Sequence, residues 1–164
     1  MGQIQNAITG AVSSIVGAQV AGELKTQREI TALTKDVGTI ADQVEKYKQH
    51  EATFQEQGKK ITAPLRHYNQ ELSLEEVKKV AYNNDTFKKA DEALGQEYEQ
   101  LKGWKTRAQQ RLNALKAKGA SSLDLEVAVK QANERIDTVE GRSPKVLWEN
   151  MVRDVNKFEQ GGQQ

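Results

Sequence analysis

The feature that most restricts the fold of this chain is a stripe of apolar residues spaced alternately three and four positions apart. The stripe consists of Ile30, Leu33, Val37, Ile40, Val44 and Tyr47, and the spacing continues at Phe54 and Ile61. Because residues at these spacings share one face of an α-helix, the pattern predicts a long helix with a coiled-coil seam. We interpret the six residues from Ile30 to Tyr47 as an oligomer seam. Glu51 and Gly58 occupy seam positions, so fraying or a bend is expected before the stretch 58–68, which contains Pro64.

Three further helices follow from capping signals. Ser73 and Glu76 have the spacing of a capping box, in which each side chain bonds the backbone N–H of the other residue. A break and new cap are expected at 83–85, and Gly119 is a natural helix stop. Ser143 and Pro144 form an N-cap followed by an N1 proline. The predicted helices span about 23–58, 73–118, 122–140 and 144–159, within a coiled-coil-like body at 23–159, and a flexible tail is expected at 160–164.

Composition agrees with an all-α fold. Only 37% of the 164 residues are hydrophobic and 5% aromatic, which suits long solvated helices better than a thick mixed core. We therefore predict long amphipathic helices arranged as a helical bundle or as an extended oligomeric assembly. The 24 basic and 23 acidic residues nearly cancel, so the chain lacks the net positive field that drives strong sequence-independent nucleic-acid binding.

The segment 1–22 contains no charged residue, and Glu23 is the first. Gly10, Ser14, Ala18 and Gly22 recur every four positions, so on a helix they form a stripe of small residues that lets another backbone approach closely. The polar residues of this segment make it a poor lone transmembrane helix. Three interpretations stay open: a buried or oligomer-packing helix, a helix that inserts into a membrane or binds its surface together with partners, and a disordered end.

No catalytic, cofactor-binding or metal-binding pattern is present, so we expect a protein that is not an enzyme and holds no cofactor. With no cysteine there is no thiol nucleophile and no cysteine-ligated zinc, and His50 and His67 lack metal-ligand spacing. A basic stretch with one aromatic residue could contact phosphates and stack on a base. It consists of Lys102, Trp104, Lys105, Arg107 and Arg111. Such a stretch is more often the solvated face of a helix.

The uncharged opening resembles the internal virion proteins that bacteriophages eject with their DNA, including the DNA pilot proteins of small icosahedral phages. The resemblance rests on Gly2, Gly10-Ala11-Val12, Ile15-Val16-Gly17-Ala18 and Val20-Ala21-Gly22, followed by the heptads from Ile30. It implies a chain that is packaged in the particle and then assembles into a helical conduit through the host envelope. This sequence departs from that pattern because it lacks a more strongly apolar transmembrane run.

The favoured function is therefore that of a phage virion structural protein that assists genome ejection. It would act by assembling a helical conduit or by inserting its N-terminal helix into the host envelope. The expected partners are further copies of the chain and other virion proteins, with the host membrane and weak non-specific DNA contact as further candidates. The expected location is the virion, and the host envelope on infection. The alternative is a cytosolic helical-bundle adaptor that acts by protein–protein interaction.

Overall fold

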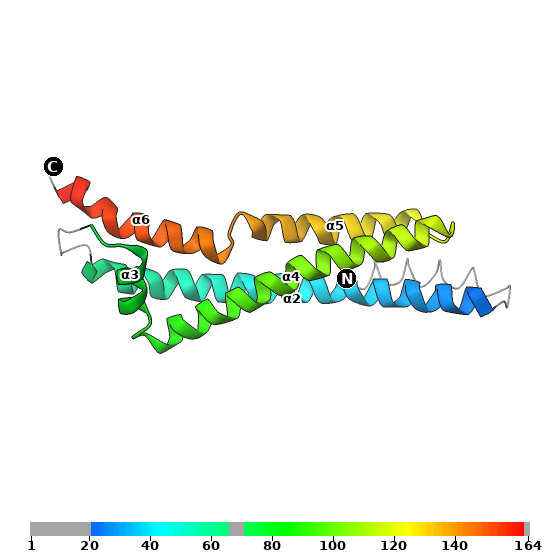
Figure 1. Ribbon diagram of the computed structural model, residues 1–164, viewed down its shortest axis with the longest axis horizontal. Helices are drawn as coiled ribbons and strands as arrows, with labels where there is room; N and C mark the ends of the chain where they lie inside the picture. Colours follow the sequence, from blue (N-terminus) through cyan, green and yellow to red (C-terminus); the bar gives the residue numbers. More distant parts are fainter. Residues whose placement is uncertain (1–20, 66–70, 163–164) are drawn as a thin grey trace. The chain divides into compact units, whose positions relative to one another are not determined.

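The computed structural model describes residues 21–65 and 71–162, and it describes side chains within 24–65 and 71–157. In chain order the helices are α2 (Ala21–Leu65), α3 (Leu74–Ala81), α4 (Asp85–Ala117), α5 (Leu123–Glu140) and α6 (Pro144–Gly162). Figure 1 follows them from the blue start of α2 to the red α6. The described residues contain no strand, and the prediction of an all-α chain is confirmed.

The apolar stripe of α2 is buried within the chain itself. Its members are between 0% and 5% exposed: Ile30, Leu33, Val37, Ile40, Val44 and Tyr47. Burying each such side chain contributes roughly 1.5–3 kcal/mol, so the stripe holds α2 to the other helices of the same chain. The three-four spacing therefore marks the core face of α2, as periodicity indicates.

The expected fraying of this helix before Gly58 is not seen, because α2 continues through Gly58 to Leu65 and contains Pro64 in its last turn. Glu51 is buried at its seam position, where its carboxylate pairs with the Arg142 guanidinium. Gly58 is also buried, and a Cβ atom there would lie 3.6 Å from Met151 Sδ, so the small residue fits a closely packed site. The predicted helix end at 58 is thus wrong.

The break between α3 and α4 lies where two asparagines and an aspartate were expected to interrupt the helix. α3 ends at Ala81, and Asn84 Oδ1 accepts a hydrogen bond from the Phe87 amide at 3.0 Å in the first turn of α4. At the other end of α4, Gly119 has a φ of +69° and Ala120 N–H bonds Leu115 C=O at 2.9 Å, which is a Schellman motif.

Serine side chains begin the last two helices. Ser122 Oγ accepts the Leu125 amide at 3.2 Å, and Ser143 Oγ accepts the Val146 amide at 3.3 Å, directly before Pro144. These bonds satisfy first-turn N–H groups that have no partner within the helix. α6 runs to Gly162, past the predicted end at 159, so the predicted flexible tail at 160–164 begins inside the helix.

The chain divides into two compact units, each with its own buried core. Unit 1 comprises the described part of Met1–Val44 together with Gln100–Thr138, and unit 2 comprises Glu45–Glu99 together with Val139–Gln164. Both α2 and α4 contribute residues to both units. In unit 1 the core residues of α4 and α5 include Leu101, Leu112, Leu115, Leu125, Val129 and Ile136. In unit 2 the core residues come from α2, α3, α4 and α6 and include Phe54, Val77, Phe87, Leu94, Met151 and Val155.

Candidate binding groove

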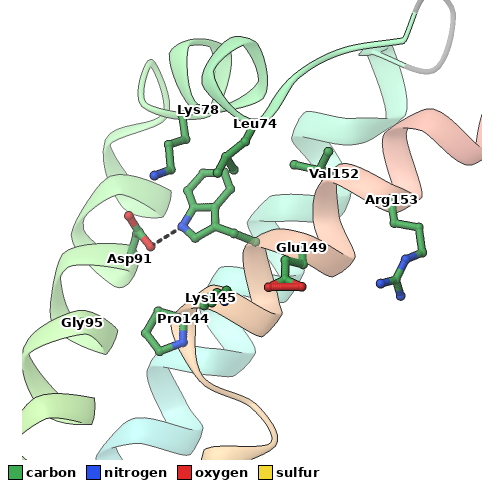
Figure 2. A pocket seen from close by; sticks show the side chains of 10 residues that line it. Leu74, Lys78, Asp91, Gly95, Pro144, Lys145, Glu149, Val152 and Arg153 are labelled. Carbon is green, nitrogen blue, oxygen red and sulfur yellow. Dashed lines mark hydrogen bonds between the residues drawn. The ribbon is translucent and has the colours of Figure 1, made fainter.

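Unit 2 contains an open groove between α3, α4 and α6. Its volume is about 730 Å³, within the range of roughly 300–1,000 Å³ that is usual for ligand-binding pockets. Figure 2 shows the groove with its lining side chains. They belong to Leu74, Lys78, Asp91, Gly95, Pro144, Lys145, Trp148, Glu149, Val152 and Arg153.

The indole of Trp148 is fixed at the groove by aromatic packing and by one hydrogen bond. Its ring meets Phe54 and Phe87 edge to face, with centroid separations of 5.5 and 5.3 Å. Such pairs contribute about 0.5–1.5 kcal/mol each beyond the area that they bury. Trp148 Nε1 donates to Asp91 Oδ1 at 2.7 Å, so its polar edge is satisfied although the residue is buried.

Asp91 accepts a second hydrogen bond, from the Tyr82 hydroxyl to its other carboxylate oxygen. The ring of Tyr82 also meets Trp148 at a centroid separation of 6.2 Å. Burial, together with the hydrogen bond to Asp91, raises the pKa of Tyr82 to about 12. Asp91 is therefore a structural acceptor whose two oxygens are each engaged by this chain.

The wall formed by α3 is short and is held by polar contacts at its start. The predicted capping box is confirmed: Glu76 N–H donates to Ser73 Oγ at 3.2 Å, and Ser73 N–H donates to Glu76 Oε1 at 3.0 Å. The Asn156 amide on α6 bonds both backbone groups of Leu72, at 2.8 and 3.0 Å. These contacts fix the adjacent Leu74, which lines the groove with 38% of its surface exposed.

Three cationic side chains lie along the groove. Lys78 Nζ sits 5.4 Å from the centroid of the Trp148 ring, a cation–π distance. Lys145 and Arg153 line the α6 side and are exposed. Within the described part of the chain, none of these three cations forms an ion pair with a carboxylate. Glu149 is the one exposed carboxylate among the lining residues.

The predicted oligomer seam from Ile30 to Tyr47 does not form a surface. These six side chains are buried by the chain itself, so the uncovered apolar stripe from which self-association was expected is not present. The spacing identified the buried face correctly, but spacing alone does not tell whether the covering helices come from the same chain or from another copy. Self-association itself stays a prediction.

Of the predicted small-residue stripe, Gly10, Ser14 and Ala18 lie outside the described residues, and Gly22 belongs to the first turn of α2. The part of the chain that the structure describes contains no helix apolar and long enough to span a bilayer. The interpretations of the segment 1–22 given above therefore stay predictions.

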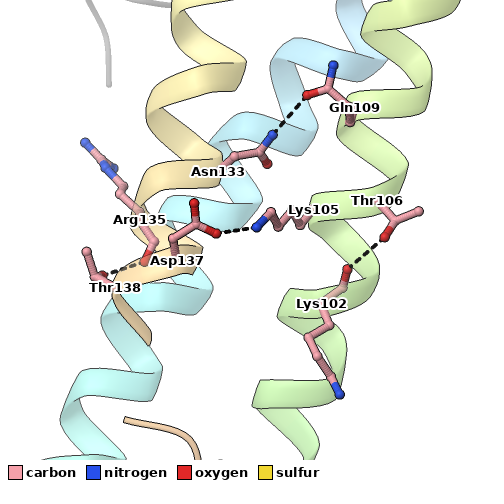
Figure 3. Close-up of polar contacts among 8 residues, drawn as sticks. All are labelled: Lys102, Lys105, Thr106, Gln109, Asn133, Arg135, Asp137 and Thr138. Atoms are coloured by element: carbon pink, nitrogen blue, oxygen red, sulfur yellow. Dashed lines mark hydrogen bonds and ion pairs between the residues drawn. The ribbon is translucent and has the colours of Figure 1, made fainter. Parts of the chain in front are cut away.

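The predicted nucleic-acid contact lies on α4 in unit 1, and two of its cations are engaged by carboxylates. Arg111 donates to Asp36, which is buried, and Lys105 pairs with Asp137 of α5 (Figure 3). The guanidinium of Arg107 stacks over the Trp104 ring at 4.6 Å from its centroid. Two of the predicted phosphate ligands thus join α4 to neighbouring helices.

His50 Nδ1 lies 2.9 Å from Glu97 Oε1, so this histidine joins α2 to α4. Within residues 24–65 and 71–157, no three His, Asp or Glu side chains come together as a metal site requires.

Sequence reasoning missed the groove. Trp148 and Leu74 were not among the predicted site residues. The available signal was that Leu74 is an apolar residue at the first position of a capped helix, directly followed by two glutamates.

The chain was compared with models of protein families, with curated proteins and with solved structures, and no match was found in any of the three.

Proposed function

We propose that this protein acts by binding another protein chain, with the groove between α3, α4 and α6 as its docking surface. The observation that supports this function most directly is the groove itself, whose apolar floor stays open although the seam and the helix cores are closed. Leu74, Pro144 and Val152 flank the buried indole of Trp148, and charged side chains surround them. An apolar centre with a charged rim is the usual anatomy of a protein interface.

The arrangement of secondary structure suits recognition of a helical segment. Grooves between helices bind amphipathic helices that place residues i, i+3 and i+4 against the apolar floor. Here α3 and α6 form two walls, and Gly95 of α4 leaves space between them because no atom lies within 4 Å of a Cβ added there. This function corresponds to the helical-bundle adaptor that the sequence left as an alternative.

Photo-crosslinking tests this proposal. One variant carries a photo-crosslinking residue in place of Val152 in the groove, and a control variant carries it in place of the exposed Lys130 on α5. We expect one partner chain to crosslink from position 152 and not from 130. The purified partner should then bind the unmodified protein and lose affinity for Gly95→Leu, whose side chain fills the groove. Equal crosslinking from both positions, or unchanged affinity of Gly95→Leu, would contradict the proposal.

A second proposal concerns the setting in which such binding takes place. The charge-free segment 1–22, directly before a charge-dense body, favours a phage virion protein that assists genome ejection. In that setting the groove would bind another virion protein, and the segment 1–22 would contact the host membrane. The partners would include further copies of the chain, and DNA contact would be weak and non-specific.

Two measurements test this setting. Mass spectrometry of purified phage particles should detect the chain. Vesicle leakage should be produced by the full chain and not by a chain that lacks 1–22 or carries Ala18→Leu, which adds bulk to the small-residue stripe. Absence from the particles, or equal leakage by the full and shortened chains, would refute the corresponding part of the proposal.

A further inference from the structure

The lining of the groove specifies the chemistry of its partner, and this inference rests on the proposed function. We infer that the groove binds an acidic amphipathic helix, in which a bulky apolar side chain packs against Trp148 and flanking Asp or Glu residues face Lys78, Lys145 and Arg153.

The lining of the groove has more positive than negative charges. Three cations and two carboxylates line the groove, but both oxygens of Asp91 already accept hydrogen bonds from Trp148 and Tyr82. These bonds come from neutral donors and leave the negative charge of Asp91 in place, so the lining carries three positive and two negative charges, and Glu149 is the exposed one of the two carboxylates. Since complementary charge across an interface steers association and fixes register, this excess of positive charge favours a negatively charged partner.

Lys78 lies where it can bind an acidic residue of a partner. Its ammonium group lies over the Trp148 ring and has no carboxylate partner among the described residues. A carboxylate that binds Lys78 would be placed beside the apolar floor, within one helical turn of a side chain that touches the indole. An acidic residue three or four positions from an apolar one has this spacing on a helix.

The floor of the groove can receive an apolar side chain of a partner. Trp148 and Asp91 fix the floor, and Leu74 and Val152 form apolar walls on α3 and α6 (Figure 2). Aromatic side chains in well-packed pockets are the usual hot spots of protein interfaces. An apolar anchor on the partner would therefore dock at Trp148, between the two walls.

The probes for the test are labelled alanine-based peptides of about 16 residues, long enough to form helix when bound. Each carries leucines at positions i, i+3, i+4 and i+7; in one peptide the flanking residues are Glu and in the other they are Lys. We expect the Glu peptide to bind the full chain at least about tenfold more tightly than the Lys peptide in fluorescence anisotropy, because the available rim charge is positive. Replacing its leucines by alanine should abolish binding.

Variants of the protein locate the site. Gly95→Leu should prevent binding of the Glu peptide, whereas Gly103→Leu should bind it normally. The two variants are matched, because both glycines lie within α4 and have no atom within 4 Å of an added Cβ, but only Gly95 lines the groove. Lys78→Glu with Lys145→Glu should weaken the Glu peptide by about tenfold or more and strengthen the Lys peptide. Thermal unfolding by circular dichroism checks that each variant folds.

The inference is overturned if the two peptides bind equally, if neither binds, or if Gly95→Leu and Gly103→Leu behave alike. Its failure is distinct from failure of the proposed function. A crosslinked partner that docks at Val152 through a basic or uncharged segment would leave the binding function intact and refute only the acidic chemistry. A second copy of this chain crosslinked at Val152 would replace the acidic partner with self-association.

Discussion

The pair formed by Glu51 and Arg142 gives a sharp test of how unit 2 is stabilised, because its two members are unequally buried. The Glu51 side chain is 9% exposed and the Arg142 side chain is 40% exposed, and their atoms Oε1 and Nε lie 3.0 Å apart. Nε lies outside hydrogen-bond geometry, so the attraction is ionic without a hydrogen bond at this atom. Removing one member should therefore have a very different effect from removing the other.

Arg142→Met leaves a carboxylate buried without its cation. Removing one member of a buried pair typically costs about 3–5 kcal/mol, and the half-exposed position of Arg142 lets water compensate in part, so we expect a loss of about 2–3 kcal/mol. Glu51→Leu places a leucine at a buried heptad position, where burial contributes about 1.5–3 kcal/mol. It also removes the anion beside a guanidinium whose Nε and one terminal nitrogen are buried without a hydrogen-bond partner, which offsets part of that gain. Because the two effects oppose each other, we expect its free energy of unfolding to change by less than about 1 kcal/mol.

Urea unfolding followed by circular dichroism and tryptophan fluorescence measures both changes, and the double variant completes the cycle. In the double variant the cost of Arg142→Met should largely disappear, because no buried carboxylate is left unpaired. The reasoning is refuted if Glu51→Leu destabilises the protein as much as Arg142→Met, or if the two effects simply add.

Three further predictions address the core, the helix glycines and the groove. Val37→Asp should lower the free energy of unfolding by several kcal/mol, since it buries an unpaired charge at a position that is 5% exposed, whereas the exposed Lys35→Gln should change little in the same urea experiment. Gly58→Ala should raise the free energy of unfolding by up to about 1 kcal/mol, because the added Cβ makes an ordinary contact within a helix. Gly119→Ala should lower it by about 1–2 kcal/mol, because the backbone there has a φ of +69°. The reverse order of the two variants would show that the packing at Gly58 is tighter than described. Stability should fall as pH rises from 10 toward 12, because the pKa of Tyr82 is raised when folded and the unfolded chain loses that proton first; Tyr82→Phe should reduce this fall in thermal unfolding curves, and an unchanged pH dependence would count against the Asp91 contact.

Helix positions and core faces were largely predictable because local chemistry determines them. The capping box at Ser73, the new helix start at Asn84 and the glycine stop at 119 each depend on residues close in sequence. The α2 stripe was predictable for a similar reason, since its period fixes one face of the helix. The failure at 51–65 has a physical cause: Glu51 and Gly58 weaken a helix only when nothing packs on them, and here Arg142 and Met151 do.

The groove was not predictable in the same way, because its members are brought together by the tertiary fold. Leu74 and Trp148 belong to different helices, and neither has a neighbour in sequence that indicates the other. Their relation depends on contacts such as that of Asn156 with the backbone of Leu72, which a pattern of apolar spacing does not contain. The charge pattern of the groove was unpredictable for the same reason. Only the structure shows that Asp91 accepts two hydrogen bonds and that Lys78 has no carboxylate partner among the described residues.

The burial of the seam also changes which surface is expected to bind. An apolar stripe read from sequence supports association only if it stays exposed, and the stripe from Ile30 to Tyr47 is at most 5% exposed at each residue. Leu74 retains 38% exposure beside a groove whose three cations have no carboxylate partner among the described residues. If assembly used the α2 stripe, the helices would have to separate first and lose the burial free energy of six large side chains. Binding at the groove requires no such rearrangement, so association through unit 2 has the smaller free-energy cost and is the route that the groove variants test.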